Sequence, residues 1–92
     1  MDEIFHLIRD GNALAIKNWL NTNENDFNAC DDHGFSILHW ACWDGRLDIV
    51  EMLVSRGAKI NIINKCEDTP LHCASQNNHI EVASLVSEFY TI

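Results

Sequence analysis

The residues of this chain whose types most readily suggest chemistry are its histidines and cysteines. Seven of them could ligate zinc: His33, His39, Cys42, Cys66, His72, Cys73 and His79. Structural zinc sites bring cysteines together as C-x2–4-C, and no two cysteines here have that spacing. Two of the histidines also recur within a repeat, which gives them a structural role. We therefore expect no bound metal and no cofactor.

Catalytic arrangements are equally weak. Cys73 follows His72 directly, and neighbours on a helix point in different directions rather than toward each other. The chain contains no G-x-x-x-x-G-K-[ST], G-x-G-x-x-G, G-x-S-x-G or H-E-x-x-H motif. The acids of its central segment are typical of solvated loops and helix ends: Asp31, Asp32, Asp44 and Asp48. We predict that the chain is not an enzyme. The alternative is a metal- or thiol-dependent enzyme, which stoichiometric zinc in the purified protein would indicate.

Composition limits the class of protein further. A chain of 92 residues with 47% apolar and 22% charged residues suits one folded domain. Its net charge of -8 argues against a nucleic-acid or anionic-membrane binder and favours a partner with a basic surface. No apolar run is long enough for membrane insertion, and the acidic start MDEIFHLIRDG is unlike a signal peptide. We expect an intracellular chain with reduced thiols.

The pattern that organises the chain is a repeat. Residues 36–54, SILHWACWDGRLDIVEMLV, align without a gap with residues 69–87, TPLHCASQNNHIEVASLVS, at an offset of 33. The motif T-P-L-H-x-A at 69–74 and the 33-residue period are the signature of ankyrin repeats. A weaker copy, RDGNALAIKNWL, occupies 9–20. We predict an all-α ankyrin-repeat solenoid of about three helix-turn-helix repeats with short loop fingers. The domain is 1–92, with repeats at about 1–30, 31–63 and 64–92.

Local signals predict the helix ends. Ser36 and Thr69 are expected N-caps, Pro70 suits the first helical turn, and Gly45 and Asn78 suit left-handed helix ends. In ankyrin repeats, the motif histidine bonds back to this cap and ties neighbouring turns, a role expected of His39 and His72. The expected buried stripes are Ala13, Ile16, Trp19, Leu20; Ile49, Val50, Leu53, Val54; and Val82, Leu85, Val86, Phe89. The last helix, lacking a polar cap, is expected to fray or self-associate.

Ankyrin repeats meet protein partners through their fingers and first helices. The corresponding positions in the second repeat are Asp32, His33, Phe35, Trp43 and Asp44. Their counterparts in the third repeat are Lys65, Cys66, Asp68, Gln76 and Asn77. Phe35 and Trp43 are the most informative, because exposed aromatic side chains with a polar rim are typical of binding hot spots. Trp40 takes a position that is usually leucine, so we expect it to pack.

Several segments resemble the N-terminal ankyrin domain of the integrin-linked kinase family. They are MDEIF at the start, NENDFN at 23–28, DDHGFS-x-LHWAC at 31–42, VEML-x-x-RGA-x-IN at 50–61 and DTPLH-x-AS at 68–75. DDHGFS and LHWAC are not consensus ankyrin residues, so this resemblance is more specific than an ankyrin match. It adds Asp31 to the candidate binding residues.

The resemblance implies a partner and a place in the cell. In that family the ankyrin repeats bind the first LIM domain, a zinc-finger module, of the PINCH adaptor in focal-adhesion complexes. We therefore expect a non-enzymatic protein-binding module in the cytoplasm, at focal adhesions. Two later repeats and a kinase-like domain have no counterpart here, so LIM binding is expected to be weak. A fragment, a short isoform and a diverged paralogue all fit. A generic ankyrin adaptor or inhibitor with another signalling or transcription partner is the alternative.

Overall fold

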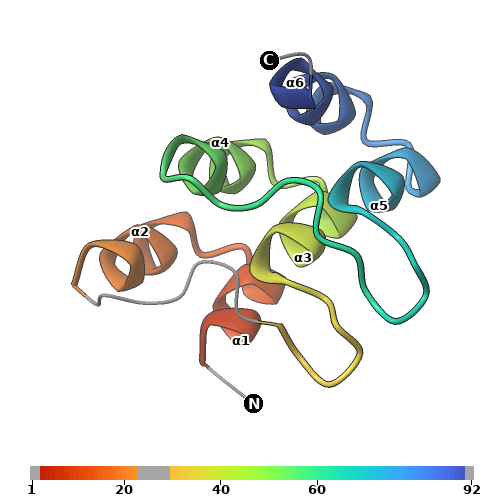
Figure 1. The fold of residues 1–92 in the computed structure, drawn as a ribbon. Helices are drawn as coiled ribbons and strands as arrows, with labels where there is room; N and C mark the ends of the chain where they lie inside the picture. The colour runs from red at the N-terminus through yellow and green to blue at the C-terminus, as the bar shows by residue number, and fades with distance from the viewer. Residues whose placement is uncertain (1–2, 23–29, 91–92) are drawn as a thin grey trace.

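The computed structural model describes residues 3–22 and 30–90, which form three consecutive helix pairs. The helices are α1 (Glu3–Asp10), α2 (Ala13–Thr22), α3 (Ile37–Asp44), α4 (Leu47–Ser55), α5 (Pro70–Gln76) and α6 (Ile80–Tyr90). In Figure 1, α1, α3 and α5 form one row and α2, α4 and α6 form a second row beside it. The described segments contain no β-strand. The predicted all-α repeat solenoid is confirmed. The segment 23–29, which carries most of the NENDFN match, lies outside the described residues.

The helix ends follow the predicted local chemistry. Ser36 and Thr69 both have extended backbone, and each side-chain oxygen accepts the amide of the residue three positions on. Pro70 occupies the first turn of α5, where its missing N–H leaves no bond unmade. Gly45 and Asn78 have left-handed backbone, with φ of 69° and 62°. These short-range signals therefore place four of the helix boundaries, as predicted.

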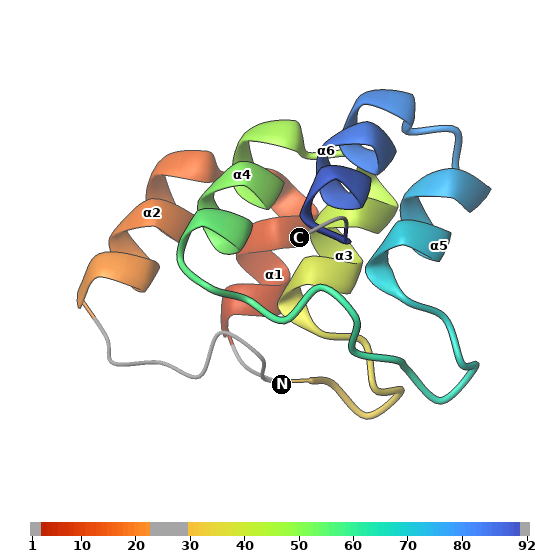
Figure 2. The ribbon, with the colours of Figure 1, turned by 45° about the horizontal axis from the view of Figure 1, so that its top comes forward.

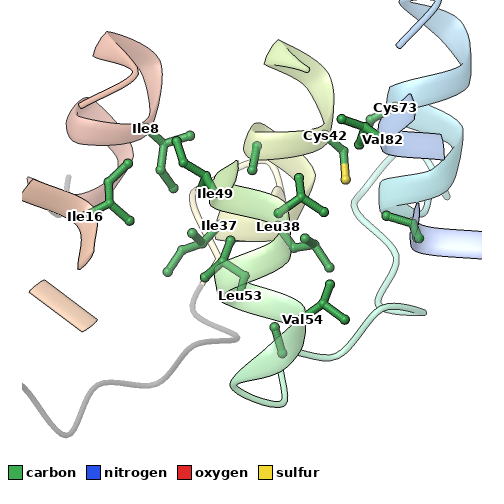
Figure 3. Close-up of a cluster of buried hydrophobic side chains, with 14 of the residues drawn as sticks. Ile8, Ile16, Ile37, Leu38, Cys42, Ile49, Leu53, Val54, Cys73 and Val82 are labelled. Carbon is green, nitrogen blue, oxygen red and sulfur yellow. The ribbon is translucent and has the colours of Figure 1, made fainter. Parts of the chain in front are cut away.

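The hydrophobic core runs along the stack between the two rows (Figure 3). All four predicted stripe residues of α4 are buried: Ile49, Val50, Leu53 and Val54. In α2, Ile16 and Leu20 are buried, whereas Ala13 and Trp19 pack at the edge of the core. In α6, Val82 and Val86 are buried and Leu85 is half-buried. Phe89, in the last turn of α6, is 37% exposed, so the predicted stripe is wrong at that position.

Side chains from each turn lie on a glycine of the preceding repeat. Arg46 lies over Gly11, and His79 lies over Gly45. A Cβ atom on either glycine would collide with the side chain above it, and both glycines have positive φ. These two glycines therefore let the turns of neighbouring repeats come close together.

The cysteines fall into two reactivity classes. Cys42 and Cys73 are fully buried, and burial raises their thiol pKa values to about 12 and about 11. Cys30 and Cys66 are exposed, and none of the four forms a disulfide. Because the thiolate is the reactive form, brief alkylation at neutral pH should label only Cys30 and Cys66. Mass spectrometry of labelled peptides measures this, with urea-unfolded protein as the control in which all four react. Equal labelling of Cys42 in the folded chain would contradict the packing.

Candidate protein-interaction face

The two fingers, residues 31–35 and 64–68, share one hydrogen-bonded design. In the first, Asp31 Oδ1 accepts the amides of His33 and Phe35 at 2.9 and 3.0 Å. In the second, Asn64 Oδ1 accepts the amides of Cys66 and Asp68 at 2.8 and 2.9 Å. Asp and Asn close such turns because their short side chains reach the backbone two residues ahead. Figure 2 shows both fingers projecting from the same side of the stack.

A backbone hydrogen bond couples the fingers to each other. The Lys65 amide donates to the His33 carbonyl oxygen at 3.0 Å. The left-handed finger residue is Gly34 in the first finger and Glu67 in the second, with φ of 78° and 64°. The paired fingers present one continuous edge, with the side chains of Asp32, His33, Lys65 and Cys66 exposed along it.

His39 ties the second repeat to the third, as predicted. Its Nδ1 accepts the Ser36 amide at 3.1 Å, and its Nε2 donates to the Asp68 carbonyl oxygen at 2.8 Å. His39 and Ser36 are both buried. His72 repeats the bonds to its own cap, Thr69, but is exposed. Within the described residues no hydrogen bond carries it to another repeat, so the predicted tie holds for His39 alone.

This geometry requires a neutral His39, because Nδ1 acts as an acceptor. Burial lowers the pKa of His39 below its ordinary value of 6.5, against a smaller opposing effect from Asp68 and Asp31. A lowered pKa in the folded chain means that the unfolded chain binds more protons in acid. The contribution to stability is complete above about pH 6.5 and is lost as the pH falls from there through the lower folded pKa.

We expect the free energy of unfolding of the wild-type chain to fall more steeply between pH 7 and pH 5 than that of His39→Gln. The variant keeps a polar side chain but has no imidazole to protonate. Urea unfolding at several pH values measures the difference. Parallel pH dependence of the two chains would show that His39 is not the responsible group.

An aromatic strip, Phe35, Trp40 and Trp43, runs from the first finger along α3. The Phe35 ring lies 4.9 Å from that of Trp40 and 6.0 Å from that of Trp43, the latter edge-on. Trp40 packs at the edge of the core, as predicted, and its Nε1 donates to Asp31 Oδ2 at 2.9 Å. Phe35 is half-buried against the core rather than exposed as expected, because Trp40 and His39 enclose it. Trp43 remains 36% exposed.

The third repeat fixes the backbone beneath Trp43. The Trp43 carbonyl oxygen accepts a hydrogen bond from Asn77 Nδ2 and another from His79 Nε2, each at 2.9 Å. A partner that covers this side chain therefore does not have to order the backbone that carries it. Asn77 was a candidate contact residue, and the structure places its amide in this support.

The remaining candidates differ in how freely they face solvent. Asp31 has both carboxylate oxygens engaged, by two finger amides and by Trp40, so it shapes the finger. Asp68 is half-buried and offers its carbonyl to His39. Gln76 is exposed and Asp44 half-buried, each at the end of its first helix. Three of the candidates, Asp31, Asp68 and Asn77, are thus engaged in hydrogen bonds that hold the fingers and repeats together.

Arg9 belongs to the same surface, although sequence reasoning missed it. Its guanidinium carbon lies 5.9 Å from the Trp40 ring centroid, a cation–π distance, and the side chain is exposed. Extending the repeat register to α1 pairs Arg9 with Trp43 and then with Gln76, since Gly11 aligns with Gly45. This alignment is the sequence signal that could have identified Arg9 as a candidate. Arg9 continues the row of inner-helix positions across all three helix pairs.

The possible zinc ligands are not brought together. Among the residues that the structure describes, no three His, Cys, Asp or Glu side chains are grouped so as to hold a metal ion. Both ring nitrogens of His39 are engaged in hydrogen bonds within the fold, and Cys42 and Cys73 lie in the core. None of the described helices is long and apolar enough to cross a membrane.

Stacked helix pairs, the caps S-I-L-H and T-P-L-H at 36–39 and 69–72, and coupled fingers define the class of protein. Residues 4–90 match the ankyrin-repeat family, in three copies, and the chain belongs to that family. It is accordingly a protein-interaction module and not a catalytic one. A chain in the solved complex of the Bd0816 predatory endopeptidase from Bdellovibrio bacteriovorus with immunity protein Bd3460 has the same fold. The TM-score is 0.90 at 28% identity, over 96% of this chain and 46% of that one.

Within this family the chain is similar to integrin-linked kinases. It is 58% identical to human scaffold protein ILK over 69 residues, which are 75% of this chain and 15% of that protein. It is 48% identical to the Caenorhabditis elegans integrin-linked protein kinase homolog pat-4 over 71 residues, 77% of this chain and 15% of that protein. The predicted resemblance is confirmed, and the chain spans about 15% of the length of these curated relatives.

Proposed function

We propose that this module binds a LIM domain of the PINCH type through its fingers and inner helices, as part of a focal-adhesion scaffold in the cytoplasm. The observation that carries the proposal is Trp43, an aromatic side chain left 36% exposed on a backbone held by two hydrogen bonds from the next repeat. The relatives named as ILK scaffold proteins support the choice of partner.

The contact surface has a centre and a rim. Trp43 is the centre, with Phe35 behind it as a half-buried support. Exposed polar side chains on the fingers and at the helix ends form the rim: Asp32, His33, Lys65 and Gln76. A hot spot of this kind gains affinity when the rim excludes water from the buried aromatic ring. The chain's net charge of -8 favours a basic partner surface and speeds encounter with it.

Replacing Trp43 with alanine should weaken binding of a purified PINCH first LIM domain by about 2 kcal/mol, roughly thirtyfold in Kd. The Trp43 carbonyl stays available to Asn77 and His79, so the fold should survive. Isothermal titration calorimetry measures the affinities. Leu14→Ala is the matched control, because Leu14 is 70% exposed on α2 and lies away from the face. Equal affinities of the wild-type and Trp43→Ala chains would remove Trp43 from the contact.

A further inference from the structure

Arg9 is a cation of the interaction face that lies against an aromatic ring. It belongs to the last turn of α1, and its side chain is exposed. Its guanidinium carbon lies 5.9 Å from the centroid of the Trp40 ring, within the range of a cation–π contact. Within residues 3–22 and 30–90, no Asp or Glu side chain forms an ion pair with it. The described structure therefore gives Arg9 an aromatic neighbour and no opposite charge.

The ring beside Arg9 is held on several sides. Trp40 packs at the edge of the core, and its Nε1 donates to Asp31 Oδ2 at 2.9 Å. The Phe35 ring lies 4.9 Å from the Trp40 ring. Asp31 is itself fixed, because its other carboxylate oxygen accepts two amides of the first finger. Trp40 is thus a fixed platform, and an arginine that lies on it has less conformational freedom to lose on binding than one that moves freely in solvent.

The contact with Trp40 leaves the hydrogen-bonding groups of Arg9 available. A guanidinium is planar and its N–H groups lie in that plane, whereas an aromatic ring attracts the cation through the ring face. The N–H groups form a fork that matches the two oxygens of a carboxylate, and the resulting pair of charge-assisted hydrogen bonds is among the stronger interactions in proteins. A guanidinium held against a ring is therefore suited to bind a carboxylate from outside the chain.

Arg9 also lies beside the proposed centre of contact. The aligned positions at the ends of the three inner helices are Arg9, Trp43 and Gln76, which place a cation, an aromatic ring and a neutral amide in successive helix pairs. A partner that covers Trp43 thus meets a cation on one side and an uncharged side chain on the other. Unequal neighbours of this kind favour one orientation of the partner over the reverse.

We infer that Arg9 is a carboxylate-binding group of the interaction face, with Trp40 as its platform, and that it binds an aspartate or glutamate side chain of the protein partner. The inference rests on the proposed function, since it needs a partner on that face. Trp43 supplies the apolar centre of the contact, and Arg9 fixes the orientation. The partner then carries an acidic side chain within reach of α1, although the net charge of -8 favours a basic surface elsewhere on it.

The test replaces Arg9 with an amine that can be captured. A carbodiimide joins an amine to a carboxylate in contact with it as an amide, with loss of water, and an arginine does not react. With the purified PINCH first LIM domain, Arg9→Lys should give a cross-link from position 9 to an Asp or Glu of the LIM domain, located by peptide mass spectrometry. Arg56→Lys is the matched control. Arg56 is exposed at the end of α4, in the outer row, and donates to Asn21, so position 56 should give no cross-link.

Affinity gives a second measurement. Arg9→Gln should weaken binding of the LIM domain about tenfold in Kd, as expected for the loss of a hydrogen-bonded charge pair. The melting temperature should change little, because the Arg9 side chain is exposed. Two outcomes would overturn the inference while the LIM domain still binds through Trp43. One is an unchanged Kd for Arg9→Gln, and the other is a complex of the Arg9→Lys chain without a cross-link from position 9.

If the LIM domain does not bind at all, the proposed function fails and Arg9 is tested with acetate as the carboxylate. In a titration with sodium acetate, compared with sodium chloride at equal ionic strength, the side-chain Nε–H resonance of Arg9 should shift at least about twofold more than that of Arg56, since only Arg9 lies on an aromatic platform. Equal shifts of the two resonances would overturn the inference.

Discussion

Replacing Leu53 with alanine is expected to lower the free energy of unfolding by about 2–5 kcal/mol. Leu53 is fully buried on α4, the middle helix of the outer row, where it packs among residues of the shared core (Figure 3). Each repeat buries its apolar face only against its neighbours, so a cavity in the middle pair weakens both inter-repeat contacts. A domain of this size has only about 5–15 kcal/mol of stability to lose.

Leu14→Ala is the matched control for Leu53, since the same atoms are removed from a side chain that is 70% exposed. It should change stability by less than about 0.5 kcal/mol. Urea unfolding followed by circular dichroism gives both values, and a single transition is expected for wild type because the stack folds cooperatively. Comparable losses for the two leucine variants would contradict the assignment of α4 to the core.

His39→Ala is expected to cost about 3 kcal/mol. The change removes the acceptor of the buried Ser36 amide and the donor to the partly buried Asp68 carbonyl oxygen. Each unsatisfied buried group costs about 1–3 kcal/mol, to which the vacated volume adds. Because the bond to Asp68 joins two repeats, the second finger should also loosen. Faster amide exchange at Lys65 and Asp68 would report that effect.

His72→Ala is the internal comparison, since His72 occupies the same place in the motif of the next repeat. It bonds only to its own cap within the described residues, and it is exposed. Its loss should therefore cost about 1 kcal/mol or less. Equal costs for the two histidines would mean that the inter-repeat bond of His39 contributes nothing, and that only the cap matters.

Sequence predicted the features that depend on neighbours along the chain. The caps at Ser36 and Thr69 and the left-handed residues Gly45 and Asn78 are set by local backbone chemistry, which a short motif contains. The α4 stripe follows from helical periodicity together with the repeat register. Because the register is fixed by several features at once, an error at one position does not shift the others.

Features that depend on packing across the stack were not predictable in the same way. Phe35 and Phe89 exchange their expected exposures: Phe35 is enclosed by Trp40, whereas Phe89 in the last turn of α6 is 37% exposed. The second role of Asp31, as acceptor for Trp40, depends on where α3 places that indole ring. His39 and His72 share a motif, but within the described residues only His39 has a hydrogen bond to the finger of another repeat.

The most direct test of the proposed binding face is a nuclear magnetic resonance titration of the isotope-labelled chain with a purified PINCH first LIM domain. The account predicts chemical-shift changes at Asp32, His33 and the Trp43 indole N–H, with little change along the outer helices α2 and α4. Absence of any change at these three residues with the LIM domain at millimolar concentration would contradict the proposal. So would changes confined to the outer helices, which would place a partner on the opposite side of the stack.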